Sequence, residues 1–172
     1  MNLFFRLLGI VLGSFHRPRL DVTTVSVVTF RVWPLDLDLN LHLTNSRYMA
    51  LMDLGRLDFI LRSNTWRVIR RGRLGVVLGG TAVRFRRSLA PFRRFTLATK
   101  ILGWDERWIY VEQVFTGPEG VACHAVLRTA FVKAGKMVPP NDALALAGRQ
   151  QPSPELPAWV GQWAETEAAF AG

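Results

Sequence analysis

The stretch LDLDLNLHLTNSRYM, residues 35–49, alternates leucine with polar residues and then changes its pattern at Thr44. Alternation is typical of an extended segment, whereas from Asn45 onward apolar and small residues recur every three or four positions. The second period predicts an α-helix from Asn45 to about Arg62, with Thr44 or Asn45 as its N-cap. Four polar side chains therefore come just before a helix start: Asp36, Asp38, Asn40 and His42.

A carboxylate beside a helix N-terminus is suited to acyl-transfer hydrolysis. The first turn of a helix has unpaired N–H groups and the positive end of the helix dipole. Such hydrolysis needs a base or nucleophile together with donors aimed at developing negative charge. Asp38 is the candidate carboxylate. Asp36 is expected to be a solvated or capping carboxylate, because short polar side chains favour caps and turns.

The rest of the chain predicts an antiparallel sheet. A β-branched and aromatic run at 23–33 predicts a strand that Pro34 ends. After an arginine-rich connection, turn signals separate four more segments, which predict four consecutive antiparallel strands. These segments lie at 74–89, 92–104, 107–115 and 120–135.

Two features refine this picture. Gly79 and Gly80 lie in mid-strand and predict a bulge or the close approach of another backbone, such as a helix on the sheet. Helical patterns at 138–148 and 158–170 are joined by a Gln/Pro/Ser linker near 149–157, and we expect accessory packing from them.

One long helix against an antiparallel sheet defines an α+β fold in a single domain. We expect an apolar segment at 1–20, the main domain at 21–138 and a helical extension at 139–172. Because the sheet covers only one side of the helix, a homodimer or a dimer of dimers is expected.

Composition narrows the chemistry. The 172 residues are 49% apolar, which is enough for a core without disulfides or metal. The single cysteine, Cys123, excludes an internal disulfide and a cysteine-based zinc cluster, and it fits a reducing compartment such as the cytoplasm. We expect no metal and no cofactor.

The first twenty residues allow two interpretations. Their apolar run is broken by Arg6 and followed by His16, Arg17 and Arg19. The run is short for a membrane span, which needs about 20 apolar residues. It lacks a small-x-small cleavage site, so we expect it to remain in the protein. It is either an interfacial anchor that meets anionic lipid at the cytoplasmic face of a membrane or a helix packed on the domain.

The opening stretch resembles the signature D-x-D-x-x-G-H-V-N-N-x-x-Y, which begins the central helix of hotdog-fold acyl-CoA thioesterases of the 4-hydroxybenzoyl-CoA type. Its two aspartates, histidine, second asparagine and tyrosine are matched by Asp36, Asp38, His42, Asn45 and Tyr48. The resemblance covers roughly residues 23–135, and the chain is also similar to the animal thioesterase superfamily member 6 group. Leu41 replaces the usual glycine and Thr44 the first asparagine.

The resemblance implies a hotdog fold and an acyl-CoA thioesterase acting in lipid metabolism. Asp38 would activate water or attack the thioester, and the N–H of Asn45 would polarise its carbonyl. His42 would orient the loop or touch substrate, or else be a structural, hydrogen-bonded histidine. The side chain of Asn45 would be a cap, and Tyr48 would bind substrate.

The net charge of +9 predicts an anionic partner. No nucleic-acid-binding signature accompanies the arginines, so no nucleic-acid partner is expected. Coenzyme A offers phosphates, and the residues proposed to bind them are Arg86, Arg87, Arg93 and Arg94. Alternation prevents Arg86 and Arg87 from facing the same side, so only part of this set can bind one ligand.

Two other functions compete. Asp38, Asn40 and His42 resemble the D-x-N-P-x-H motif of hotdog enoyl-CoA hydratases, but the proline is missing and the histidine comes one residue early. The leucine at position 41 instead leaves open a non-catalytic acyl-CoA-binding protein at a membrane.

Overall fold

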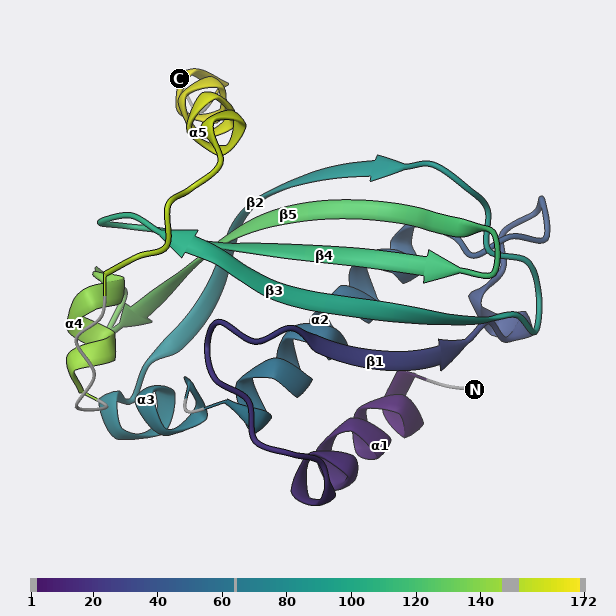
Figure 1. The fold of residues 1–172 in the computed structure, drawn as a ribbon, viewed down its shortest axis with the longest axis horizontal. Helices are drawn as coiled ribbons and strands as arrows, with labels where there is room; N and C mark the ends of the chain where they lie inside the picture. The colour runs from purple at the N-terminus through teal and green to yellow at the C-terminus, as the bar shows by residue number, and fades with distance from the viewer. Residues whose placement is uncertain (1–2, 64, 147–151, 171–172) are drawn as a thin grey trace.

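An antiparallel sheet curls around one long helix, α2 (Asn45–Arg62) (Figure 1). The computed structural model describes residues 3–63, 65–146 and 152–170. Within them the strands are β1 (Ser26–Arg31), β2 (Gly75–Phe85), β3 (Arg94–Trp104), β4 (Ile109–Gly117), β5 (Gly120–Lys133) and β6 (Lys136–Val138). This arrangement confirms the predicted α+β fold, and α2 has the predicted bounds.

The order of the strands differs from the simple succession expected from the turn signals. The sheet runs β1-β3-β4-β5-β2, and β6 pairs with β5. The four predicted strands are present and antiparallel, but β2 pairs with β5 and not with the next strand along the chain, β3. Residues 86–93 form the connection that crosses one end of the sheet to β3 (Figure 1). Turn residues indicate where the chain reverses direction, but they do not indicate which strand will pair with the strand before the turn.

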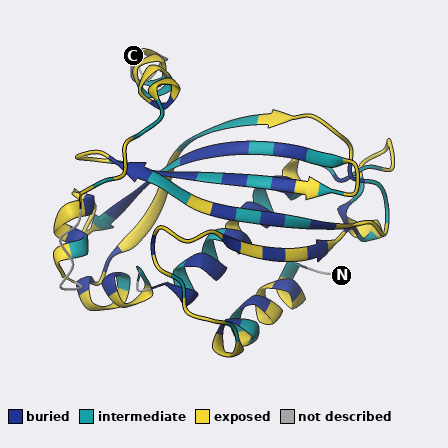
Figure 2. Ribbon diagram, viewed as in Figure 1, coloured by how far each residue is buried: buried dark blue, intermediate teal, exposed yellow. Residues whose placement is uncertain are grey.

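The core lies between α2 and the concave face of the sheet. Leu51 and Met52 of α2 are fully buried, as are Leu97 and Phe115 of the facing strands. Gly55 allows the close approach, because a Cβ there would lie 2.7 Å from Cδ2 of Leu97. Burial alternates strictly along β1, as expected of a sheet with one face on the core (Figure 2).

The paired glycines of β2 mark a bulge, as predicted. The register with β5 shifts between Leu78 and Gly80. The space above Gly79 is filled by the Trp108 ring, and that above Gly80 by the Glu167 carboxylate of α5 (Ala158–Phe170). Small residues here let the accessory helix approach the sheet.

The N-terminal helix α1 (Leu3–His16) turns most of its large apolar side chains outward. Its buried residues are Arg6, Ile10 and Ser14, which lie one above another at four-residue spacing. Its exposed face is apolar and includes Phe4, Phe5, Leu8, Leu12 and Phe15. No described helix combines the length and apolarity needed to cross a membrane.

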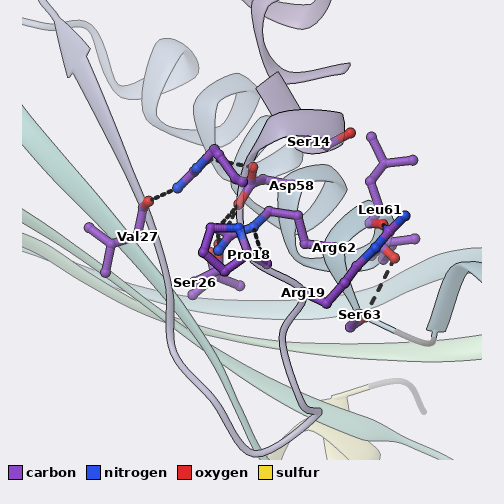
Figure 3. Close-up of polar contacts among 12 residues, drawn as sticks. Ser14, Pro18, Arg19, Ser26, Val27, Asp58, Leu61, Arg62 and Ser63 are labelled. Atoms are coloured by element: carbon purple, nitrogen blue, oxygen red, sulfur yellow. Dashed lines mark hydrogen bonds and ion pairs between the residues drawn. The ribbon is translucent and has the colours of Figure 1, made fainter. Parts of the chain in front are cut away.

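Hydrogen bonds and ion pairs join the residues that follow α1 to the helix α2 (Figure 3). Arg17 donates to Oδ1 of Asp58 at 2.7 Å, and Arg62 donates to Oδ2 of Asp58 at 3.0 Å. The hydroxyl of Ser26 also donates to Asp58. The N–H of Leu20 donates to the carbonyl of Arg62 at 3.0 Å. Residues 3–20 are thus joined to the main domain.

The arginine-rich connection contains a short helix, α3 (Thr65–Gly72), which the sequence did not reveal. Its Val68 packs in a small cluster with Phe131 and with Ala143 of α4 (Pro140–Ala145). The linker expected near 149–157 begins outside the described residues. Tertiary packing is what holds so short a helix.

Candidate functional site

The polar stretch before α2 forms a tight hairpin, residues 36–44. Two backbone hydrogen bonds of 2.9 Å and one β-bridge join its arms. The pairs are Asp36 with Thr44, Leu37 with Leu43, and Asp38 with His42. Only two of the stretch's leucines, at 37 and 43, pack toward the core, while those at 35, 39 and 41 are exposed. The alternation thus encodes a hairpin with its tip in solvent.

Asp38 is exposed on this hairpin. Its Oδ1 accepts the backbone N–H of Asn40 at 2.9 Å and that of His42 at 3.1 Å. No described residue donates to its Oδ2. One carboxylate oxygen is therefore held by the loop, and the other is open to a substrate or to water.

The start of α2 leaves donors unused next to this hairpin. Thr44 is the N-cap, but its side chain makes no capping hydrogen bond. Its carbonyl accepts the N–H groups of Arg47 and Tyr48. The N–H groups of Asn45 and Ser46 have no acceptor among the described residues. They form a ready site for developing negative charge at the positive end of the helix dipole.

His42 and Tyr48, which also match the motif, have different surroundings. His42 is half-buried, and its backbone supports Asp38, while no described group hydrogen-bonds its imidazole. Tyr48 is buried between the rings of Phe85 and Phe115, with centroid distances of 5.2 and 4.9 Å. Burial raises the pKa of Tyr48 well above its ordinary value. The ring of Tyr48 is thus part of the core beneath the site.

Leu41 occupies the position of the motif's glycine and keeps a glycine-like backbone, with φ of 57°. A left-handed conformation costs a non-glycine residue about 1–2 kcal/mol. Its side chain is 64% exposed. The hairpin therefore keeps its shape despite the leucine, at a local cost in strain.

Asp36 is fully buried, which corrects the expectation of a solvated carboxylate; its capping role is present. It ends the 3-10 turn η1 (Pro34–Asp36), and its carboxylate accepts the N–H of Trp33 at 2.9 Å. It forms ion pairs with Arg6 of α1 and, at 3.1 Å, with Arg47 of α2. This carboxylate joins three parts of the fold.

An arginine-lined pocket lies beside the hairpin. The connection 86–93 runs past it, and the N–H of Leu43 donates to the carbonyl of Leu89 at 3.0 Å. Arg87 and Arg93 line a pocket of about 260 Å³ together with the turn 117–120. Arg86 and Arg94 are exposed but do not line it. Within the described chain, none of the four arginines has a carboxylate partner.

A second, apolar pocket of about 70 Å³ lies under the sheet, lined by Arg56, Phe59 and side chains of β3 to β5. Arg56 donates to Gln113 at 3.1 Å and pairs with Asp53, and burial lowers the pKa of Arg56. Arg56 lies eleven residues along α2 from Asn45, or about 16 Å at helical rise. This pocket is therefore separate from the hairpin. In the described part of the chain, no group of three or more His, Cys, Asp or Glu residues could hold a metal ion.

Known proteins share this architecture. Residues 32–164 match the model of the thioesterase-like superfamily. Protein THEM6 of Xenopus laevis is 33% identical over 77% of the chain and 63% of its own length, and the thioesterase lcsJ of Purpureocillium lilacinum is 27% identical over 75% and 50%. The chain thus spans only part of these curated relatives. The solved structure of protein SAV2348 from Staphylococcus aureus in complex with CoA has a TM-score of 0.62, with 14% identity over 81% of this chain and 94% of that one.

Proposed function

We propose that this chain, which belongs to the thioesterase-like superfamily, hydrolyses an acyl-CoA thioester to a free acid and CoA. The observation that carries the proposal is the placement of Asp38. Its Oδ1 is fixed by two backbone N–H groups, and its hairpin leads directly into a helix start where the N–H groups of Asn45 and Ser46 find no acceptor among the described residues. Catalysis of thioester hydrolysis needs a carboxylate and hydrogen-bond donors placed together in this way.

In the base mechanism, Oδ2 of Asp38 takes a proton from water, and the hydroxide adds to the thioester carbonyl carbon. The carbonyl oxygen becomes negative and is stabilised by the N–H of Asn45, at the positive end of α2. The C–S bond then breaks, and Asp38 gives its proton to the CoA thiolate. His42 contributes through its backbone N–H, which helps to hold Asp38.

In the nucleophile mechanism, Asp38 itself adds to the carbonyl carbon and expels the CoA thiolate. The product is a mixed anhydride between the acyl group and Asp38, which water then hydrolyses. The N–H groups of Asn45 and Ser46 would stabilise the oxyanion of the first step. In the second step, water adds to the carboxyl carbon of Asp38 and the acyl carboxylate leaves, so one oxygen atom of water enters the Asp38 carboxylate. Oxygen exchange into the carboxylate distinguishes the two mechanisms.

The nucleotide of CoA is assigned to the arginine-lined pocket. Arg87 and Arg93 offer guanidinium groups that suit phosphates, and the hydrogen bond from Leu43 to Leu89 ties this pocket to the hairpin. The likeness to a solved structure that contains CoA supports CoA as the ligand. Arg86 and Arg94 take a smaller part, because they lie outside the pocket.

The proposal includes a homodimer that forms through β2. This strand is an edge of the sheet, and within the described residues it pairs only with β5. An exposed apolar edge is a template for another strand. Its exposed apolar side chains are Val76, Val77, Leu78 and Phe85. Light scattering at micromolar concentration should give the mass of a dimer or a dimer of dimers, and a monomer would contradict the proposal.

The outer face of α1 is assigned to an anionic lipid surface on the cytoplasmic side of a membrane. Phe4 and Phe15 are 62% and 72% exposed, and the first twenty residues contain basic but no acidic side chains. Replacing both phenylalanines with serine should reduce co-sedimentation with anionic liposomes. Because α1 also packs on α2, these substitutions test the surface more cleanly than deletion of residues 1–20. Unchanged binding by the doubly substituted protein would contradict the assignment.

A screen of acyl-CoA esters of graded chain length with a thiol reagent tests the main proposal. We expect thiol release that depends on the enzyme and on chain length. Saturable binding without thiol release would instead favour a non-catalytic acyl-CoA-binding protein. Loss of enoyl absorbance without thiol release would identify a hydratase.

A further inference from the structure

Arg6 projects from α1 into the interior of the protein. Its side chain is 1% exposed, and its Nη2 donates both to Asp36 and to the carbonyl of Arg31, the latter at 3.0 Å. Its Nε and Nη1 have no hydrogen-bond partner within the described residues. A buried guanidinium loses its hydration, and only a close carboxylate compensates for this. Arg6 and Asp36 therefore fix each other's position.

Asp36 is also the first residue of the hairpin that carries Asp38. Its carbonyl accepts the N–H of Thr44 at 2.9 Å, which closes the hairpin where α2 begins. Its carboxylate pairs with Arg47 in the first turn of α2. The orientation of Asp36 thus sets the direction in which the hairpin leaves the helix start.

We infer that Arg6 is a positioning residue for the site. Through Asp36, α1 holds the hairpin so that Asp38 keeps a constant direction toward the N–H groups of Asn45 and Ser46. The inference rests on the proposed function, because that proposal makes Asp38 the reacting carboxylate. It gives the inner face of α1 a part in catalysis that is separate from the lipid contact assigned to the outer face.

The chain offers a matched control. Arg17 also belongs to the N-terminal segment and also pairs with a buried aspartate, Asp58. When Arg17 is removed, Asp58 keeps Arg62; when Arg6 is removed, Asp36 keeps Arg47. Both substitutions loosen α1 while leaving the aspartate one arginine partner. Only the loss of Arg6 acts at the hairpin.

The experiment compares Arg6→Met with Arg17→Met in the full chain. Hydrogen exchange is measured at the amides of Asn40, His42 and Thr44, and thiol release is measured with the best acyl-CoA ester. For Arg6→Met we expect these amides to exchange about tenfold faster. We also expect kcat to fall about 10- to 100-fold with little change in KM, since small misplacements of a reacting group cost this much. Arg17→Met should retain the wild-type values for all of them.

Equal exchange rates at these amides in the two variants would overturn the inference, even if both proteins were less stable. Should Arg6→Met fail to fold, the comparison is made between Arg6→Lys and Arg17→Lys. Arg6→Lys should then give faster exchange at these amides and a lower kcat than the wild type, while Arg17→Lys should not. Wild-type values for Arg6→Lys would overturn the inference. If the wild type has no thioesterase activity, the proposed function fails, but the exchange measurement still decides whether Arg6 holds the hairpin.

Discussion

Asp36 and Asp38 are two residues apart, yet their carboxylates have opposite surroundings. Asp36 is fully buried and pairs with two arginines, whereas Asp38 is exposed and, among the described residues, is held only by backbone N–H groups of its own hairpin. A carboxylate neutralised by two guanidinium groups is a structural anchor. A carboxylate with one oxygen fixed and the other open is suited to chemistry.

The first prediction concerns the anchor. Asp36→Asn removes the charge that compensates for Arg6 and Arg47, so the protein should lose about 3–5 kcal/mol of its free energy of unfolding. Urea unfolding measures this loss. Asp53→Asn is the control, because Asp53 is also ion-paired but is 69% exposed. It should change the unfolding free energy by about 0.5 kcal/mol or less. Equal effects of the two substitutions would contradict the anchoring role.

The second prediction concerns the strained leucine. Leu41→Gly places glycine where φ is 57°, so relief of strain should exceed the entropy that glycine adds to the unfolded chain. We expect a gain of about 0.5–1 kcal/mol, or a rise in Tm of about 2 °C, by differential scanning calorimetry. Leu39→Gly, at a neighbouring exposed position without positive φ, should instead lower the unfolding free energy by about 0.5–1 kcal/mol. The same sign for both substitutions would show that strain at Leu41 does not matter.

A third prediction separates the arginines. Replacing Arg87 or Arg93 with glutamine should raise KM for acyl-CoA about tenfold with little effect on kcat, because a remote phosphate contact is uniform binding. Arg86→Gln and Arg94→Gln should have smaller effects, since these residues lie outside the pocket. The control substrate is a short pantetheine thioester that lacks the nucleotide. An equal rise in KM for this substrate would refute a role in phosphate binding.

Much of the fold could be predicted from local patterns, and the remainder depends on tertiary contacts. The three- and four-residue period fixed both ends of α2, and Gly79 and Gly80 indicated the bulge. The pairing of β2 with β5 was not predictable from turn residues. Helix α3 lies in a segment that reads as a charged connection and is held by packing on its neighbours.

The site shows the same division. The motif predicted the helix start at Asn45, which the structure confirms, and it singled out Asp38 as the candidate carboxylate, whose role stays a proposal. It did not reveal that Asp36 is buried, since the partner of Asp36 is Arg6, thirty residues earlier in the chain. The available signal was a lone arginine within an apolar helix, at four-residue spacing from Ile10 and Ser14. That spacing places Arg6 on the inner face only once α1 is known to pack on α2.

A fourth prediction concerns pH. Burial raises the pKa of the Cys123 thiol from 9.0 to about 12. Above pH 9 the unfolded chain loses this proton while the folded protein keeps it, so the free energy of unfolding should fall as pH rises from 9 toward 12. The contribution is about 1.4 kcal/mol per pH unit once the unfolded thiol is fully ionised. Urea unfolding between pH 8 and 10.5 should show a steeper fall in the wild type than in Cys123→Ala. Equal dependence of the unfolding free energy on pH in the two proteins would contradict this contribution of Cys123.

The last prediction concerns the reacting group. Asp38→Asn keeps the size and hydrogen-bonding oxygen of the side chain but removes its negative charge. We expect kcat for thioester hydrolysis to fall at least about 100-fold, the lower end for loss of a positioned base. Oligomeric state, acyl-CoA affinity and unfolding free energy should stay near their wild-type values, because the side chain is exposed and its Oδ1 can still accept the N–H groups of Asn40 and His42.

Isotope labelling then separates the two forms of the mechanism. During many turnovers in water enriched in oxygen-18, a nucleophilic Asp38 should incorporate the label into its own carboxylate, since water opens the anhydride at the carboxyl carbon of Asp38. A base only moves a proton, so Asp38 would remain unlabelled while the acid product gains one labelled oxygen. Mass spectrometry of the peptide containing Asp38 reads the difference, and the peptide containing Asp53 is the control for chemical exchange. Full activity in Asp38→Asn would exclude both forms, because hydrolysis would then proceed without this carboxylate.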